Sequence, residues 1–172
     1  MKIRALPVFL SLILTLGLLF GGWFMYQQFY VQRPIEEFIV SKQQVVLKEM
    51  DIHKVPVTVE LDFKDPNTFA MDFKEIKQFI ASKTNKPVEI RIPPAGEEMK
   101  KLWEEEYFFI AEAIKKQEYS EIPKIIEKVE KERQLEKSVT RMDQENIYVY
   151  LQKGSDHLYA VLPLTEEVKP GE

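Results

Sequence analysis

The strongest constraint on the fold is an apolar run near the N-terminus. No charged side chain lies between Arg4 and Arg33, and residues 5–26 are almost entirely apolar. About 20 helical residues, each rising about 1.5 Å, cross the ~30 Å hydrocarbon layer of a bilayer. The sequence therefore predicts a single transmembrane helix over residues 5–26, preceded by a cytoplasmic stub of residues 1–4.

The flanking charges predict the orientation of this segment. Lys2 and Arg4 precede it, whereas only Arg33 follows it before Glu36 and Glu37. The positive-inside rule then keeps the N-terminus in the cytoplasm. We expect a single-pass protein of the cell membrane with its C-terminal domain outside the cytoplasm.

A cleaved signal peptide is the alternative interpretation of the same run. Signal peptidase requires small residues at its site, but Leu19 and Phe20 stand where small side chains are needed, and no Ala-x-Ala precedes the charged region. The sequence favours an anchor that is not cleaved.

The chain contains no cysteine, which excludes disulfides, a thiol nucleophile, a C-x-x-C redox site and thiolate-bound zinc. An extracytoplasmic domain without cysteine agrees with an envelope that does not routinely form disulfides, such as that of a Gram-positive bacterium. Without Lys2 and Arg4, 22 basic residues face 28 acidic ones, a net charge of about −6. This acidity argues against a nucleic acid as partner.

Residues 27–50 predict a juxtamembrane stalk helix. Pro34 suits a first helical turn, and apolar residues recur every three, four or seven positions. The stripe consists of Ile35, Phe38, Ile39, Val45, Val46 and Met50. Because it is too short for a sustained heptad pattern, docking onto the body is favoured over dimerisation.

Residues 51–165 predict one α/β (α+β) domain with the order β-α-β-α-α-β-β. Residues 57–63 and 88–92 alternate as strands, and a helical pattern lies between them, which predicts a parallel crossover. Two helical stretches follow, and then a hairpin that turns at "KGSD". We expect two layers, with helices on one face of a mixed sheet of about four strands, and a flexible tail at residues 166–172. Thioredoxin-like domains have a similar order, but this chain has neither their C-x-x-C motif nor a final helix.

Chemical motifs are weak throughout the sequence. The two histidines, His53 and His157, are far apart in the chain, and the neighbouring Ser155 and Asp156 lie with His157 beside a turn. Adjacent turn residues point in different directions, so they do not form a nucleophile–base pair. No hydrolase elbow, phosphate loop or EF-hand spacing is present. We predict no catalytic residue, no cofactor and no metal ligand.

Aromatic residues gather in the stretch "LWEEEYFFIAEAI". At helical spacing Trp103 and Tyr107 join the apolar face with Met99, whereas Phe108 and Phe109 leave it. Either this helix is buried on two sides, or one edge is left for a partner or a membrane surface. The candidate partner-binding residues are Phe108 and Phe109, with the polar face of the sheet at Glu60, Glu89 and Arg91 as the second surface.

These features together predict a membrane-anchored extracytoplasmic binding or assembly module, an accessory component of bacterial cell-envelope machinery, rather than an enzyme. Two alternatives remain open. A membrane-tethered hydrolase would require convergent acids that no motif reveals, and a ligand-sensing module would require a closed cavity. The partner is expected to be another envelope protein.

Overall fold

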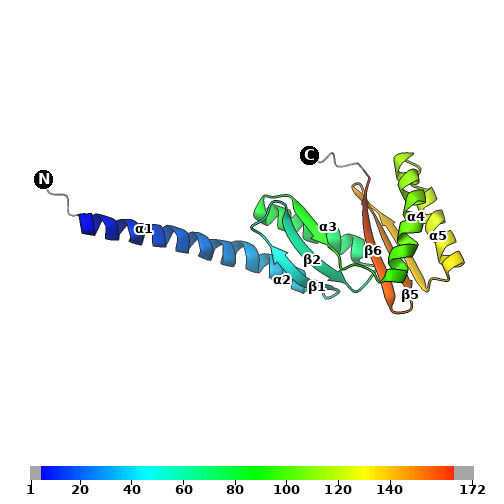
Figure 1. Ribbon diagram of the computed structural model, residues 1–172, viewed down its shortest axis with the longest axis horizontal. Helices are drawn as coiled ribbons and strands as arrows, with labels where there is room; N and C mark the ends of the chain where they lie inside the picture. The colour runs from blue at the N-terminus through cyan, green and yellow to red at the C-terminus, as the bar shows by residue number, and fades with distance from the viewer. Residues whose placement is uncertain (1–4, 165–172) are drawn as a thin grey trace.

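The computed structural model describes residues 5–164, which form a long N-terminal helix and a body built on two sheets (Figure 1). The stub predicted at residues 1–4 and the tail predicted at residues 166–172 lie outside this range. The fold belongs to the predicted α+β class, with the apolar helix at the N-terminus.

The N-terminal helix is continuous from the apolar run into the body. α1 (Ala5–Tyr26) passes through a π-helical segment, η1 (Gln27–Gln32), into α2 (Arg33–Ser41). Within the described residues one helix, Phe9–Ser41, is long and apolar enough to cross a membrane. Its large apolar side chains from Phe9 to Tyr26 are exposed, as lipid-facing side chains would be.

The prediction that this helix reaches residue 50 is wrong. It ends at Ser41, and Val45–Asp51 forms strand β1. Val45, Val46 and Met50 fit the spacing of a helical stripe in the sequence, but in the structure they lie along β1 and pair with residues of β2. The prediction that the stalk docks on the body is confirmed, since Ile35 and Ile39 of α2 are fully buried in its core.

The first sheet has the strand order β1-β2-β3, with β2 at Val57–Phe63 and β3 at Val88–Arg91. β1 is antiparallel to β2, whereas β2 and β3 are parallel and joined through α3 (Phe69–Thr84), which confirms the predicted crossover. Alternate residues of β2 are buried, so one face of the sheet packs against α2 and α3 and the other remains polar.

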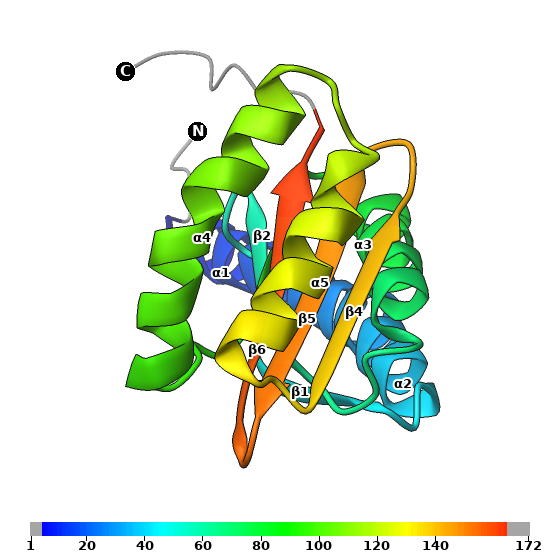
Figure 2. The ribbon, with the colours of Figure 1, turned by 90° about the vertical axis from the view of Figure 1, so that its right-hand side faces the viewer.

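The second sheet has the order β4-β5-β6, formed by Lys137–Met142, Asn146–Lys153 and Asp156–Pro163. The predicted hairpin is the antiparallel pair β5–β6. α4 (Glu97–Lys115) and α5 (Glu121–Arg133) cover one face of this sheet (Figure 2). Their core side chains pack with Ile147, Val149 and Leu151 of β5, whereas Tyr148 and Tyr150 point to the opposite face.

The body thus has two three-stranded sheets instead of the predicted single sheet of about four strands. β1 and β4 are the two strands that the sequence pattern did not reveal. Both lie at sheet edges, and β4 reads "KSVTRM", without a clear apolar alternation. Tertiary pairing with β5 makes this segment a strand.

An aromatic cluster joins the two sheets. Phe69 of α3 lies 5.6 Å, between ring centroids, from Tyr148 of β5 and 4.7 Å from Tyr159 of β6. Phe63 of β2 contacts the same group, with its ring centroid 4.8 Å from that of Phe69. All of these rings are at least nine-tenths buried. The two halves are therefore one packed unit, and side chains of α2 and β1, which precede the domain start predicted at residue 51, belong to its core.

One carboxylate of the β5–β6 hairpin caps α4 across the fold. Asp156 Oδ1 accepts the backbone N–H of Gly96 at 2.8 Å, and Oδ2 accepts that of Met99 at 3.3 Å. No side chain from α4's own N-cap does this, because that residue is Gly96. A Cβ at Gly96 would lie 2.5 Å from Asp156 Oδ2, so the close approach requires glycine.

Replacing Asp156 with Ala should lower the free energy of unfolding by about 1 to 2 kcal/mol, because two N–H groups at the start of α4 lose their acceptor. Asp156→Asn, which keeps an acceptor, should cost less. The adjacent His157→Ala is the control, since His157 is exposed. Urea unfolding followed by circular dichroism measures all three, and equal stability of Asp156→Ala and the wild type would contradict the capping role.

Candidate functional site

Three adjacent aromatic residues of α4 are exposed on the body surface. The exposed fractions are 45% for Tyr107, 69% for Phe108 and 53% for Phe109. We name these three residues the aromatic ridge. At about 100° per residue, Phe108 lies opposite the buried stripe that contains Met99 and Ile110. The helix packs on one side only, which is the second of the two arrangements that the sequence allowed.

Tyr107 corrects the sequence prediction, which placed it on the inward face with Trp103. Trp103 is half-buried, but Tyr107 lies a further 40° or so around the helix and has left the interface with the sheet. The buried stripe instead runs through Met99, Leu102, Ile110 and Ala113. These small and medium side chains complete the contact with the second sheet, so the fold does not require the ridge for its core.

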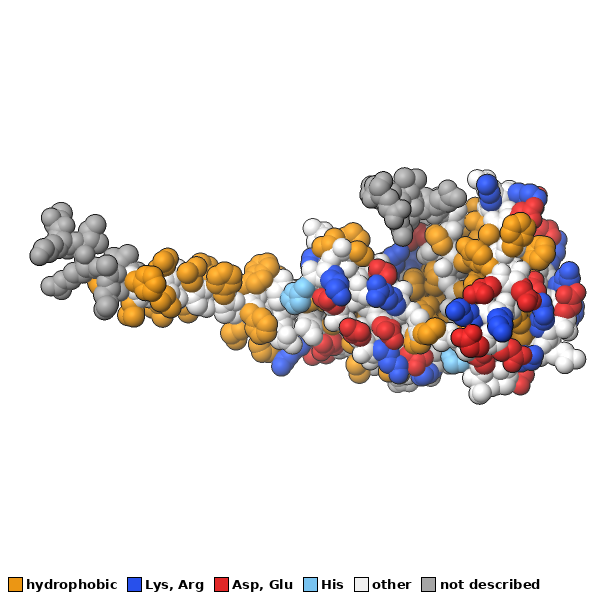
Figure 3. Space-filling view, viewed as in Figure 1, with side chains coloured by type: hydrophobic (Ala, Val, Ile, Leu, Met, Phe, Trp, Pro, Cys, Tyr) orange, Lys and Arg blue, Asp and Glu red, His pale blue; other side chains and the backbone are white. Residues whose placement is uncertain are grey.

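A hollow lies on each side of the aromatic ridge. The α4–α5 hollow, of about 230 Å³, has Phe109, Ala113 and Ile125 as its apolar wall. The larger α4–β6 hollow, of about 560 Å³, is lined by Tyr107, Ile114 and other residues of α4 and β6. Figure 3 shows apolar side chains along the N-terminal helix and again at the opposite end of the molecule, where Figure 1 draws α4.

Charged groups surround the aromatic ridge. Glu104 and Glu105 precede it by one turn and Glu112 follows it by one turn. Arg133 of α5 donates to Glu105 at 2.5 Å, and Lys116 donates to Glu112 at 2.6 Å. The side-chain hydrogen bond to Glu105 raises the pKa of Arg133.

The second predicted surface, on the polar face of the first sheet, is also assembled by the fold. Glu60 of β2 and Arg91 of β3 are directly paired in the parallel register, and Arg91 Nε donates to Glu89 Oε1 at 2.9 Å. The three side chains thus gather as predicted. The hollow beside Glu60 and Arg91 measures only about 40 Å³, and Arg91 is already paired with Glu89, so this surface offers less to a partner than the ridge.

The residues around the hairpin turn do not converge on a reactive group. Both carboxylate oxygens of Asp156 accept backbone N–H groups at the start of α4, and the His157 ring faces Tyr159, 5.7 Å away between centroids. In the part of the chain that the structure describes, no group of three or more His, Cys, Asp or Glu residues could hold a metal ion.

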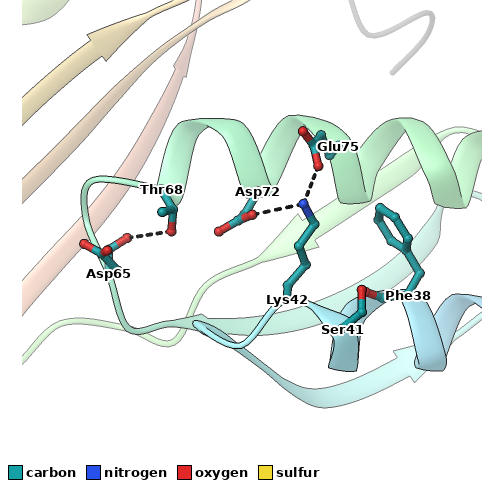
Figure 4. Close-up of polar contacts among 7 residues, drawn as sticks. All are labelled: Phe38, Ser41, Lys42, Asp65, Thr68, Asp72 and Glu75. Carbon is teal, nitrogen blue, oxygen red and sulfur yellow. Dashed lines mark hydrogen bonds and ion pairs between the residues drawn. The ribbon is translucent and has the colours of Figure 1, made fainter.

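A polar clamp between the end of α2 and α3 was not predicted from the sequence. Lys42, just after α2, contacts the carboxylates of Asp72 and Glu75 on α3 (Figure 4). The Asp72 contact is 3.3 Å long, and Asp72 is one of two buried polar residues in the described core. The sequence feature that could have indicated this clamp is Asp72, an acidic residue within the apolar stripe of α3. The hydrogen bond to Glu75 raises the pKa of Lys42 against the effect of burial.

Stacked rings reinforce this junction. Phe38 of α2 and Phe79 of α3 are nearly parallel, with centroids 4.2 Å apart. Together with the Lys42 clamp they hold α2, the last part of the N-terminal helix, against α3 of the body.

Comparison with protein families, with curated proteins and with solved structures finds no match for this chain.

Proposed function

We propose that this protein is a membrane-anchored binding or assembly module of the bacterial cell envelope, with its body outside the cytoplasm, and that it acts without catalysis. The observation that carries the proposal is the aromatic ridge, Tyr107, Phe108 and Phe109, exposed at the end of the molecule opposite the anchor helix. The basic residues Lys2 and Arg4 support the orientation.

Exposed aromatic residues of this kind are typical of interfaces. Aromatic side chains are enriched among residues that dominate binding energy, and contiguous apolar patches mark interaction sites. The ridge is not an incompletely covered core, because α4 already buries Met99, Leu102 and Ile110 against the second sheet. Binding would remove from water a surface that the fold leaves exposed.

The position of the ridge favours a protein partner over a lipid surface. In the end-on view of Figure 2, α4 and α5 lie in front of the second sheet and α1 lies behind it. The ridge is thus far from the bilayer in which α1 would be embedded. The glutamates beside it also oppose contact with anionic lipid.

Replacing Phe108 with Ser tests the proposal. We expect capture of the partner by in-cell crosslinking to weaken by about thirty-fold, corresponding to about 2 kcal/mol, because an exposed aromatic anchor is lost. The melting temperature should change little, since the side chain is largely exposed. Phe109→Ser is the second variant.

Met142→Ser is the matched control, because Met142 is an apolar residue on β4, outside the ridge, whose exposed fraction of 57% lies between those of Phe109 and Phe108. It should leave capture unchanged. Capture that survives Phe108→Ser and Phe109→Ser at the wild-type level would refute the role of the ridge and direct attention to Glu60, Glu89 and Arg91.

A further inference from the structure

We infer that the aromatic ridge binds a basic amphipathic helix of the partner, which lies along α4 over Phe108 and inserts apolar side chains into the α4–α5 hollow. This inference rests on the proposed binding function and specifies the chemistry of the partner.

The shape of the surface indicates a helical partner. α4 and α5 run side by side over the second sheet, and the hollow between them has an apolar wall of Phe109, Ala113 and Ile125. A groove between two packed helices accepts a third helix through side chains spaced three or four residues apart. Phe108, one residue from Phe109, extends the apolar contact outward over the crest of α4.

The charge around the hollow indicates a cationic partner. Its lining includes the acids Glu106, Glu112, Glu118 and Glu121 but only two lysines, Lys116 and Lys128. With the exported chain at about −6, this surface repels a second copy of itself and attracts a cationic segment. Glu106 already pairs with Arg133 and is largely buried. The pairs of Glu112 with Lys116 and of Glu121 with Lys124 are exposed, so lysines or arginines of a partner can exchange into these two.

The two properties together define the occupant. An apolar wall requires a helix with large apolar side chains on one face, and the acidic rim requires positive charge on its flanks. An acidic or purely apolar segment lacks one of these matches.

The test uses the full chain in phosphatidylcholine nanodiscs and three synthetic 18-residue peptides. The first has a Leu/Phe face and a Lys face, the second has Glu in place of Lys, and the third has Ala in place of Leu and Phe. Calorimetry should show that the first peptide binds at least ten-fold tighter than the other two, after subtraction of binding to empty nanodiscs. Its affinity should fall at least ten-fold with Phe109→Ser and decrease as salt is added.

Charge variants provide a matched comparison. Glu112→Gln combined with Glu118→Gln removes two acids from the hollow and should weaken the Lys peptide several-fold. Glu127→Gln combined with Glu132→Gln removes the same charge from α5 outside that hollow and should have little effect. Equal losses in the two double variants would show only a long-range charge effect and would overturn the proposed site.

Four other results would overturn the inference. Two concern the peptides: equal binding of the Lys and Glu peptides, or binding that Phe109→Ser leaves unchanged. The other two would indicate a different occupant of the surface: self-association in sedimentation that Phe108→Ser abolishes, or ridge-dependent binding to vesicles containing phosphatidylglycerol. If any of these occurs while Phe108→Ser still weakens capture in cells, the binding function stands and only the partner chemistry is wrong. If capture in cells is independent of the ridge, the proposed function itself fails.

Discussion

A fragment of residues 51–164 is expected to show no cooperative melting transition, whereas a fragment of residues 28–164 is expected to melt cooperatively. The shorter fragment lacks α2 and β1. It therefore loses Ile35 and Ile39, which are fully buried, and Val45, which is 6% exposed. It also exposes the edge of β2 that pairs with β1.

The expected effect is large relative to the stability of a domain. Full burial of one Val or Ile side chain contributes about 1.5 to 3 kcal/mol, and total stabilities are about 5 to 15 kcal/mol. Three such losses, together with the missing strand, remove most of that margin. Circular dichroism during heating, without detergent, measures both fragments. Melting of the two at the same temperature would show that α2 and β1 are dispensable.

The second large effect is expected at the joint between the sheets. Phe69→Ala should lower the free energy of unfolding by about 3 to 5 kcal/mol, because Phe69 is 2% exposed and its removal leaves a cavity among Phe63, Tyr148 and Tyr159. Urea unfolding of residues 28–164 provides the measurement. Met71→Ala on the same helix is the control, since Met71 is exposed, and it should change stability by no more than about 0.5 kcal/mol.

The same variant tests whether the body unfolds as one unit. The fragment of residues 28–164 keeps a single tryptophan, Trp103, which lies on α4 beside the second sheet and not on the element that carries Phe69. If the aromatic cluster couples the halves, Trp103 fluorescence and circular dichroism shift together in Phe69→Ala. A fluorescence transition that stays at its wild-type urea concentration would show that the halves unfold independently.

Local periodicity was enough to predict the elements whose own residues alternate cleanly. β2 has a buried residue at every second position, and the hairpin is delimited by "KGSD", so both were predicted correctly. β1 was misread because Val45, Val46 and Met50 continue the apolar stripe of α2 in register, and nothing local marks the change at Ser41.

Contacts between residues distant in the sequence explain what the sequence could not reveal. The cap of α4 joins Gly96 to Asp156, and the clamp joins Lys42 to Asp72 and Glu75. Each pair is determined by the packing of two elements whose relative position no local pattern encodes. The candidate site was easier to predict from the sequence, because helical spacing alone places Phe108 on a different face of the helix from Ile110 and Met99.

The helix that runs from α1 through η1 to α2 ends in the Lys42 clamp, so no loop separates the apolar helix from the body. In the proposed topology, rotation of the anchor helix about its own axis would keep the ridge at a constant height above the lipid surface. A partner embedded in the same bilayer would then meet the ridge by lateral diffusion, provided that the partner's basic helix lies at the same height above the lipid. Lengthening the partner's juxtamembrane segment by a few helical turns should abolish the encounter even though every contact residue is intact.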